Sequence, residues 1–229
     1  MKTWTVGDVM TVAVESVDES ASYRDVVDLL IGKRFSAVPV VDDFHRVIGV
    51  VSEADLLRKI EYGGDEAPRI FDGSRRRGER RKALGRTPAD LMSAPAVVTF
   101  AGASITAAAR QMDSEGVKRL PVIDDLGRLA GIVSRADLLK VHLRTDQEIL
   151  AAVETDVLCT VLPEESATVD VAVVNGVVTL SGRVDRWSSM DIAVRLSRQV
   201  PGVVDVTSSL EYRFDDRHVR GIHLGTGLA

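Results

Sequence analysis

A duplication without gaps constrains the fold of this chain more than any other feature of its sequence. The motif GVVSEADLL at 49–57 returns as GIVSRADLL at 131–139, VPVVDD at 38–43 returns as LPVIDD at 120–125, and DVMT at 8–11 returns as DLMS at 90–93. Matching residues are 82 positions apart in all three cases. A constant offset without insertion or deletion predicts two copies of one structural unit.

Within each copy the pattern predicts the element order β-α-β-β-α. A strand at 12–17 or 96–100 is followed by a helix that begins near Ser20 or Ser104. Helical spacing of four apolar residues predicts one buried face for the first of these helices: Val26, Val27, Leu30 and Ile31. Two strands come next, and in the second copy the turn DDLGR between them offers a glycine for positive φ.

The last helix of each copy begins at a serine that is followed three residues later by an aspartate. Ser52 with Asp55 and Ser134 with Asp137 form this S-x-x-D arrangement, which is typical of a capping box. Capping alone therefore accounts for all four residues without any ligand.

Composition excludes several classes of protein. Hydrophobic residues make up 45% of the 229 positions, which is enough for real cores, and the net charge of −5 argues against a general nucleic-acid binder. No run of eighteen apolar residues predicts a membrane span. The first ten residues lack the apolar region of a signal peptide, so we expect a cytoplasmic protein. The single cysteine, Cys159, cannot form an internal disulfide and fits a small buried side chain.

A charged segment at 61–87 separates the copies. Its stretch RRRGERRKALGR at 75–86 carries seven Arg or Lys residues against one Glu. Two interpretations stay open: a solvated surface segment, or a contact for a phosphate, an acidic partner or RNA.

The pattern changes after about residue 145 and predicts a second small domain of the order α-β-β-α-β. A helix capped by Thr145 places Ile149, Val153 and Val157 on one stripe, and Asn175-Gly176 marks a tight hairpin. Another helix and a strand follow. We divide the chain into a first repeat at 1–60, a basic linker at 61–87, a second repeat at 88–144, a small domain at 146–213 and a flexible tail at 214–229.

Both copies contain, in register, the motifs G-h-h-S-x-x-D and h-P-V-h-D, where h is an apolar residue and x any residue. These motifs resemble those of a tandem pair of cystathionine-β-synthase (CBS) domains, the Bateman module. Residues 146–213, with NGVVTLSGRV and VPGVVDV, resemble a BON domain. The combined order is similar to that of small CBS-BON proteins of actinobacteria. The resemblance implies a mixed α/β (α+β) fold in which the two repeats pack as a module ahead of the BON domain.

The resemblance also implies a ligand. In this family the motif aspartate binds the ribose hydroxyls of an adenine nucleotide, and the serine contacts its phosphate. A carboxylate can accept from two vicinal hydroxyls, and a helix start suits an anion. AMP, ADP or ATP would therefore bind as a regulatory ligand in the cleft between the repeats, without a covalent cofactor. S-adenosylmethionine and NAD are alternatives within the family.

Two nucleotide sites follow from the same resemblance. The favoured site consists of Asp137, Ser134, Arg135, Lys118, Arg119, Leu120, Pro121, Ser93 and Ala94. The second site consists of Asp55, Ser52, Ala37, Val38, Pro39, Thr11 and Val12. We favour the first because Arg135 adds affinity for a polyphosphate, whereas Glu53 stands at the matching position of the other copy. For Val38 and Leu120, burial in a core is an equally good explanation.

No constellation of residues predicts catalysis or a metal site. The four histidines, His45, His142, His218 and His223, are scattered without metal-ligand spacing. We therefore expect a non-enzymatic regulatory protein that relays nucleotide binding to the BON domain or to a partner, and the resemblance implies a homodimer formed by the CBS modules. The alternative is an adaptor with vestigial sites, in which the CBS pair serves for dimerisation and the BON domain contacts a protein or phospholipid.

Overall fold

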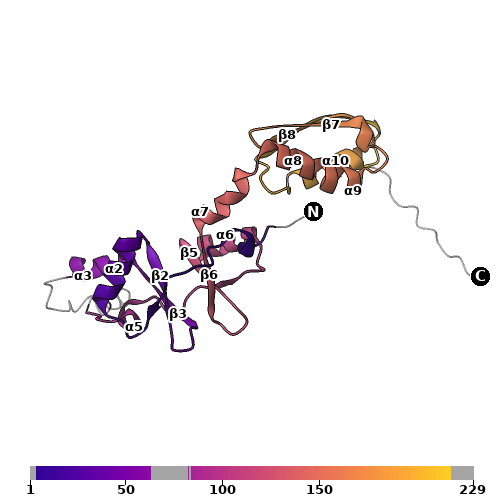
Figure 1. Ribbon diagram of the computed structural model, residues 1–229. Coiled ribbons are helices and arrows are strands. Elements are labelled where there is room, and N and C mark those ends of the chain that lie inside the picture. Colours follow the sequence, from indigo (N-terminus) through magenta and orange to yellow (C-terminus); the bar gives the residue numbers. More distant parts are fainter. Residues whose placement is uncertain (1–3, 63–81, 83, 218–229) are drawn as a thin grey trace, which may run out of the picture. The chain divides into compact units, whose positions relative to one another are not determined.

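The computed structural model describes residues 4–62, 82 and 84–217 (Figure 1). These residues fall into two compact units, one spanning Trp4–Leu138 and one that begins at Leu139. Most of the basic run at 75–86, and the tail beyond 217 with His218 and His223, lie outside the described residues. No helix in the described ranges is both long and apolar enough to cross a bilayer.

The first unit contains the two repeats. The first repeat comprises α1 (Val6–Val9), β1 (Val17–Asp18), α2 (Tyr23–Lys33), β2 (Ala37–Val41), β3 (Val47–Ser52) and α3 (Glu53–Glu61). The second comprises α5 (Pro88–Leu91), β4 (Thr99–Phe100), α6 (Ile105–Ser114), β5 (Arg119–Ile123), β6 (Leu129–Ser134) and α7 (Arg135–Leu138). In each sheet the central strand pairs in parallel with the first strand and antiparallel with the third. The mixed α/β fold with duplicated units is thus confirmed.

Three local predictions for the repeats differ from the structure. The strands expected at 12–17 and 96–100 shrink to β1 and β4, because only their last residues reach the central strand of each sheet. The first helix begins after Ser22 rather than near Ser20, and Ser22 accepts from the Asp25 backbone N–H. Ile31, expected on the buried face of α2, is 73% exposed because the helix turns Val26 and Leu30 into the core instead.

The two repeats exchange their leading segments, which we define as residues 4–11 and 86–93. In the first leading segment, α1 contributes Val6 and Val9 to the core of the second repeat, beside Met112 and Leu120. In the second leading segment, Leu91 is fully buried in the core of the first repeat. Figure 1 shows α5 among the indigo and violet elements of the first repeat.

Backbone hydrogen bonds fix this exchange. Thr11 and Ile132 bond each other reciprocally at 2.9 Å, and Ser93 exchanges two bonds of 2.9 and 3.1 Å with Val50. Each leading segment therefore adds a bridge to the third strand of the other repeat, close to the motif serine of that strand.

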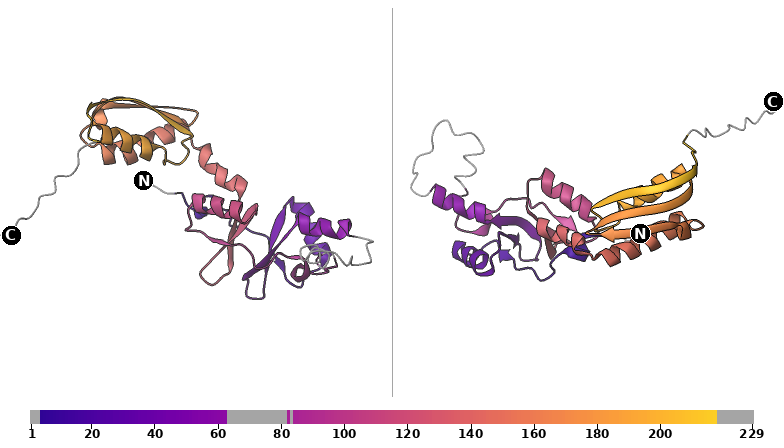
Figure 2. Two further views of the ribbon diagram at one scale, coloured as in Figure 1. Left: turned by 180° about the vertical axis from the view of Figure 1, so that it is seen from behind. Right: turned by 90° about the horizontal axis from the view of Figure 1, so that it is seen from above.

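The second unit is built from helical segments and one sheet. A 3-10 turn η1 (Leu139–Leu143) precedes α8 (Asp146–Ala152), the π-helical η2 (Val153–Leu158), α9 (Cys159–Val161) and η3 (Ser166–Thr168). Then come β7 (Val169–Val174), β8 (Val177–Arg186), α10 (Trp187–Ser197) and β9 (Asp205–Phe214). Strand β8 pairs antiparallel with β7 and parallel with β9, and Figure 2 shows the helices along one face of this sheet. The order α-β-β-α-β is confirmed.

Most local predictions for this unit are confirmed. Thr145 caps α8, and Ile149, Val153 and Val157 are buried in one core. Asn175 and Gly176 both have positive φ, at 51° and 75°, as a tight I′ hairpin requires. Cys159, however, is exposed, because the buried stripe passes through its neighbours Val157 and Leu158.

Two residues after β9, Asp216 and Arg217, make side-chain contacts, although the sequence predicted a flexible tail from 214. Asp216 accepts from the backbone N–H of Ser188 at 3.0 Å and from its hydroxyl, and Arg217 lies over the Trp187 ring. The start of α10 is therefore tied to the segment that follows the last strand.

Candidate functional site

Both S-x-x-D motifs form the predicted helix starts. The Asp137 Oδ2 atom accepts from the Ser134 N–H at 2.9 Å and from its hydroxyl at 2.6 Å. The Asp55 Oδ2 atom accepts from the same two groups of Ser52, at 3.0 and 2.6 Å. Capping thus engages Oδ2 of each aspartate, and the two motifs differ in what surrounds them.

The Asp137 site, which we define as Asp137, Ser134, Arg119, Thr11 and Ser36, combines residues of both repeats. Arg119 lies opposite Ser134 in the β5–β6 ladder. Its Nε donates to the Ser36 hydroxyl at 3.0 Å, and Ser36 lies just before β2 of the first repeat. Thr11 is bridged to Ile132 in β6, the strand that ends at Ser134. A half-buried guanidinium therefore lies one strand away from the motif serine.

The Asp55 site, which we define as Asp55, Ser52, Ser93 and Lys82, already contains a cation. The Lys82 ammonium lies 3.1 Å from Asp55 Oδ1 and 3.0 Å from the Ser93 hydroxyl. Asp55 is only 6% exposed, and Ser93 is positioned by its backbone bonds to Val50. The sequence offered one signal for Lys82: it belongs to the basic run that directly precedes the second leading segment.

Each leading segment lies at the other aspartate site from the one to which the sequence assigned it. Ser93, with Ala94 next to it, lies by Asp55 and not by Asp137, whereas Thr11, with Val12 next to it, lies by the strand that ends at Ser134. The reason is the exchange of leading segments between repeats. The repeat offset establishes which residues correspond, but it does not say which copy each segment packs against.

Four other residues expected at the nucleotide sites are buried, and core packing accounts for their apolar character. Leu120 and Val38 are 0% and 1% exposed, each within the core of its own repeat, and Pro39 and Pro121 are buried beside them. These side chains present little accessible surface to a ligand in this structure. The core explanation, which the sequence left open for Leu120 and Val38, therefore applies.

The remaining residues expected at the two sites make different contacts in the two repeats. The Arg135 side chain donates to the Met112 carbonyl at 3.4 Å, and its backbone N–H donates to the carbonyl of the exposed Lys118. Ala37 pairs with Ser52 as Arg119 pairs with Ser134. Arg119 therefore gives the Asp137 site a positive charge that Ala37 does not supply at the matching position.

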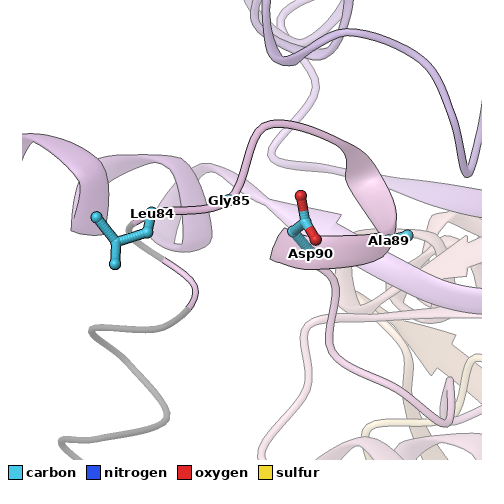
Figure 3. A pocket seen from close by; sticks show the side chains of 4 residues that line it. All are labelled: Leu84, Gly85, Ala89 and Asp90. Atoms are coloured by element: carbon cyan, nitrogen blue, oxygen red, sulfur yellow. The ribbon is translucent and has the colours of Figure 1, made fainter.

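A pocket of about 360 Å³ lies elsewhere, lined by Leu84, Gly85, Ala89 and Asp90 (Figure 3). Asp90 has a structural role there: the backbone N–H groups of Arg86 and Thr87 hold the pKa of its carboxyl below the usual range. The pocket shares no residue with the two aspartate sites. Across the ranges that the structure covers, no three His, Cys, Asp or Glu side chains gather as a metal site.

A family model described as CBS domain matches residues 6–62 and 89–144, and one described as BON domain matches residues 145–213. The chloroplastic CBS domain-containing protein CBSX2 of Arabidopsis thaliana is 31% identical over 157 residues. That match covers 63% of this chain and 66% of the relative, so it leaves about a third of the relative unmatched.

Two solved structures share the fold. The crystal structure of CBSX2 in complex with AMP has a TM-score of 0.54 and 32% identity, and covers 61% of this chain and 97% of that one. The CBS domain pair of protein MJ0100, in complex with 5′-methylthioadenosine and S-adenosyl-L-methionine, has a TM-score of 0.50 and covers 61% of this chain and 96% of that one. Its identity of 16% shows similarity of fold alone.

Proposed function

The chain belongs to the CBS-domain proteins, with two CBS domains followed by a BON domain, and we propose that it senses an adenine nucleotide without catalysing a reaction. The ligand is AMP in the first instance, because the CBSX2 structure, at 32% identity, is a complex with AMP. The proposed site is the Asp137 site. Its carboxylate accepts from the two ribose hydroxyls, as carboxylates do with vicinal diols.

One observation carries this choice: the Arg119 guanidinium bonds Ser36 of the first repeat and lies opposite Ser134 of the second. A guanidinium in that position provides the charge-assisted hydrogen bonds that a phosphate needs. The Asp55 site has Ala37 at the matching position and Glu53 in its motif, neither of which favours an anion.

The same contact offers a way to convert binding into a signal. A phosphate bound by Arg119 would share the guanidinium whose Nε donates to Ser36, so we expect the ligand to alter a hydrogen bond that joins the two repeats. A ligand shifts an equilibrium only if it binds two states unequally, so this mechanism requires that the bond differ between the free and bound arrangements. The receiver of the signal is the BON domain or a partner protein, in a homodimer formed by the CBS domains in the cytoplasm.

Thermal unfolding with added AMP, ADP, ATP, S-adenosylmethionine or NAD tests the proposal. At one hundred times its dissociation constant a ligand stabilises by about 2.7 kcal/mol. We expect this for AMP, with loss of the shift in Asp137→Asn and Arg119→Ala and retention in Asp55→Asn. Arg119→Ala is a matched change, because it installs the residue that the first repeat carries at Ala37.

Two results would contradict the proposal. Loss of the AMP shift in Asp55→Asn alone would move the ligand to the other site. No shift with any compound would favour the adaptor with vestigial sites, for which co-sedimentation with phospholipid vesicles is the next experiment.

A further inference from the structure

We propose that Lys82 is a built-in occupant of the Asp55 site and keeps adenine nucleotides out of it. The inference rests on the proposed function, because it concerns the second of two related sites. The Lys82 ammonium contacts Asp55 Oδ1 and the Ser93 hydroxyl at 3.1 and 3.0 Å. The side chains of Lys82 and Asp55 are 22% and 8% exposed, so this ion pair is largely screened from water.

The position of the ammonium explains the exclusion. Asp55 Oδ2 is engaged by the backbone N–H and hydroxyl of Ser52, so Oδ1 is the oxygen that capping does not use. Lys82 donates to this oxygen, where a ribose would have to donate. Bonds from Lys82 and from a ribose to this carboxylate are both charge-assisted, but only Lys82 also brings an opposite charge, at a position where both side chains are largely buried. A nucleotide would therefore exchange a stronger partner of Asp55 for weaker ones.

The elements around Lys82 hold it in place. Its backbone carbonyl accepts from the Gly85 N–H at 2.9 Å, and the Gly85 carbonyl accepts from Lys59 on α3 at 2.7 Å. Ser93, the second acceptor, is bonded twice to Val50 on β3. Lys82 is thus anchored to the same repeat whose aspartate it contacts, through the leading segment that this repeat receives from the other.

Isothermal titration of the full chain with AMP tests the exclusion. We expect one AMP per chain in the wild type and two in Lys82→Met, which keeps the unbranched stem and removes the ammonium. Adding Asp55→Asn to Lys82→Met should abolish the additional binding. Lys33→Met is the matched control, because it removes the same charge from an exposed ion pair with Glu15 and should leave one AMP per chain.

Acylation of lysines by acetic anhydride, followed by peptide mapping, tests the contact without any nucleotide. Asp55→Asn should increase the Lys82 rate severalfold and leave the Lys33 rate unchanged, since Lys82 loses its charged partner. An unchanged Lys82 rate would overturn the proposal.

The titration separates this inference from the proposed function. One AMP per chain in both wild type and Lys82→Met would overturn the exclusion and keep the Asp137 site. Weaker binding in Lys82→Met would also overturn it, by making Lys82 a ligand contact. AMP binding by Lys82→Met alone would support the exclusion and overturn the Asp137 assignment, whereas no binding by either protein would overturn both.

Discussion

The glycines that begin the two G-h-h-S-x-x-D motifs are required for close approach and not for an unusual φ. A Cβ at Gly131 would lie 2.7 Å from Met10 Sδ, and a Cβ at Gly49 would overlap Met92 Sδ. Each methionine comes from the leading segment that the other repeat contributes. The motif glycine of one repeat and the methionine of the D-h-M pattern (DVM at 8–10, DLM at 90–92) of the other therefore form one contact.

Gly49→Ala should destabilise the CBS unit by about 1–3 kcal/mol, because an inserted methyl group overpacks a filled site. Thermal unfolding measures the effect. Adding Met92→Ala should recover part of the loss, which a double-mutant cycle reports as coupling between the two positions. Gly102→Ala is the control, since nothing lies within 4 Å of its Cβ position. Equal stability of Gly49→Ala and Gly102→Ala would refute this explanation of the motif glycines.

The chemistry of individual residues was predictable where it depended on local spacing. Ser52, Asp55, Ser134 and Asp137 form the expected capping bonds because an S-x-x-D pattern determines its own geometry at a helix start. The contact of Lys82 with Asp55 joins residues 27 positions apart, across a segment without periodicity. Nothing in local pattern specifies such a pair.

At the scale of elements, the duplication predicted the repeats but not their exchange. Strands β1, β2 and β3 correspond to β4, β5 and β6 at the same offset of 82 as the motifs. The leading segments carry the same D-h-M pattern, so each would fit the groove of either copy. Pattern alone therefore left the partner undetermined, and the assignment of Ser93 and Thr11 to the two sites was reversed for this reason.

Leu91→Ala tests the exchange, because Leu91 follows the linker and yet is buried in the first repeat. We expect a loss of about 2–5 kcal/mol from the cavity. Native-state hydrogen exchange should show faster exchange in β2 and β3 than in β5 and β6. Leu120→Ala, in the core of the second repeat, should show the reverse order. If the amides of β5 and β6 instead exchanged hydrogen faster than those of β2 and β3 in Leu91→Ala, the packing of the second leading segment against the first repeat would be contradicted.

At the scale of the whole molecule, the two units differ in their hydrogen-bonded carboxyls. Several described carboxyls in turns and helix starts have a pKa below the usual range because hydroxyl, backbone or arginine donors bond their charged form. In the CBS unit these are Asp18, Asp25, Asp42, Asp90 and Asp124. In the unit that contains the BON domain they are Glu148 and Asp216. The charged form of each group is favoured by folding.

Acid should therefore destabilise the CBS unit more than the unit that contains the BON domain. A carboxyl with a lowered folded-state pKa adds stability that is present above its unfolded pKa and is lost as the pH falls through its folded pKa. Calorimetry between neutral pH and about pH 3 should show the CBS transition falling further in temperature. Asp124→Asn keeps an oxygen for the Leu126 and Arg128 N–H groups and should reduce this acid dependence, while the other transition stays unchanged. Equal acid shifts of both transitions would show that these carboxyls do not set the difference between the units.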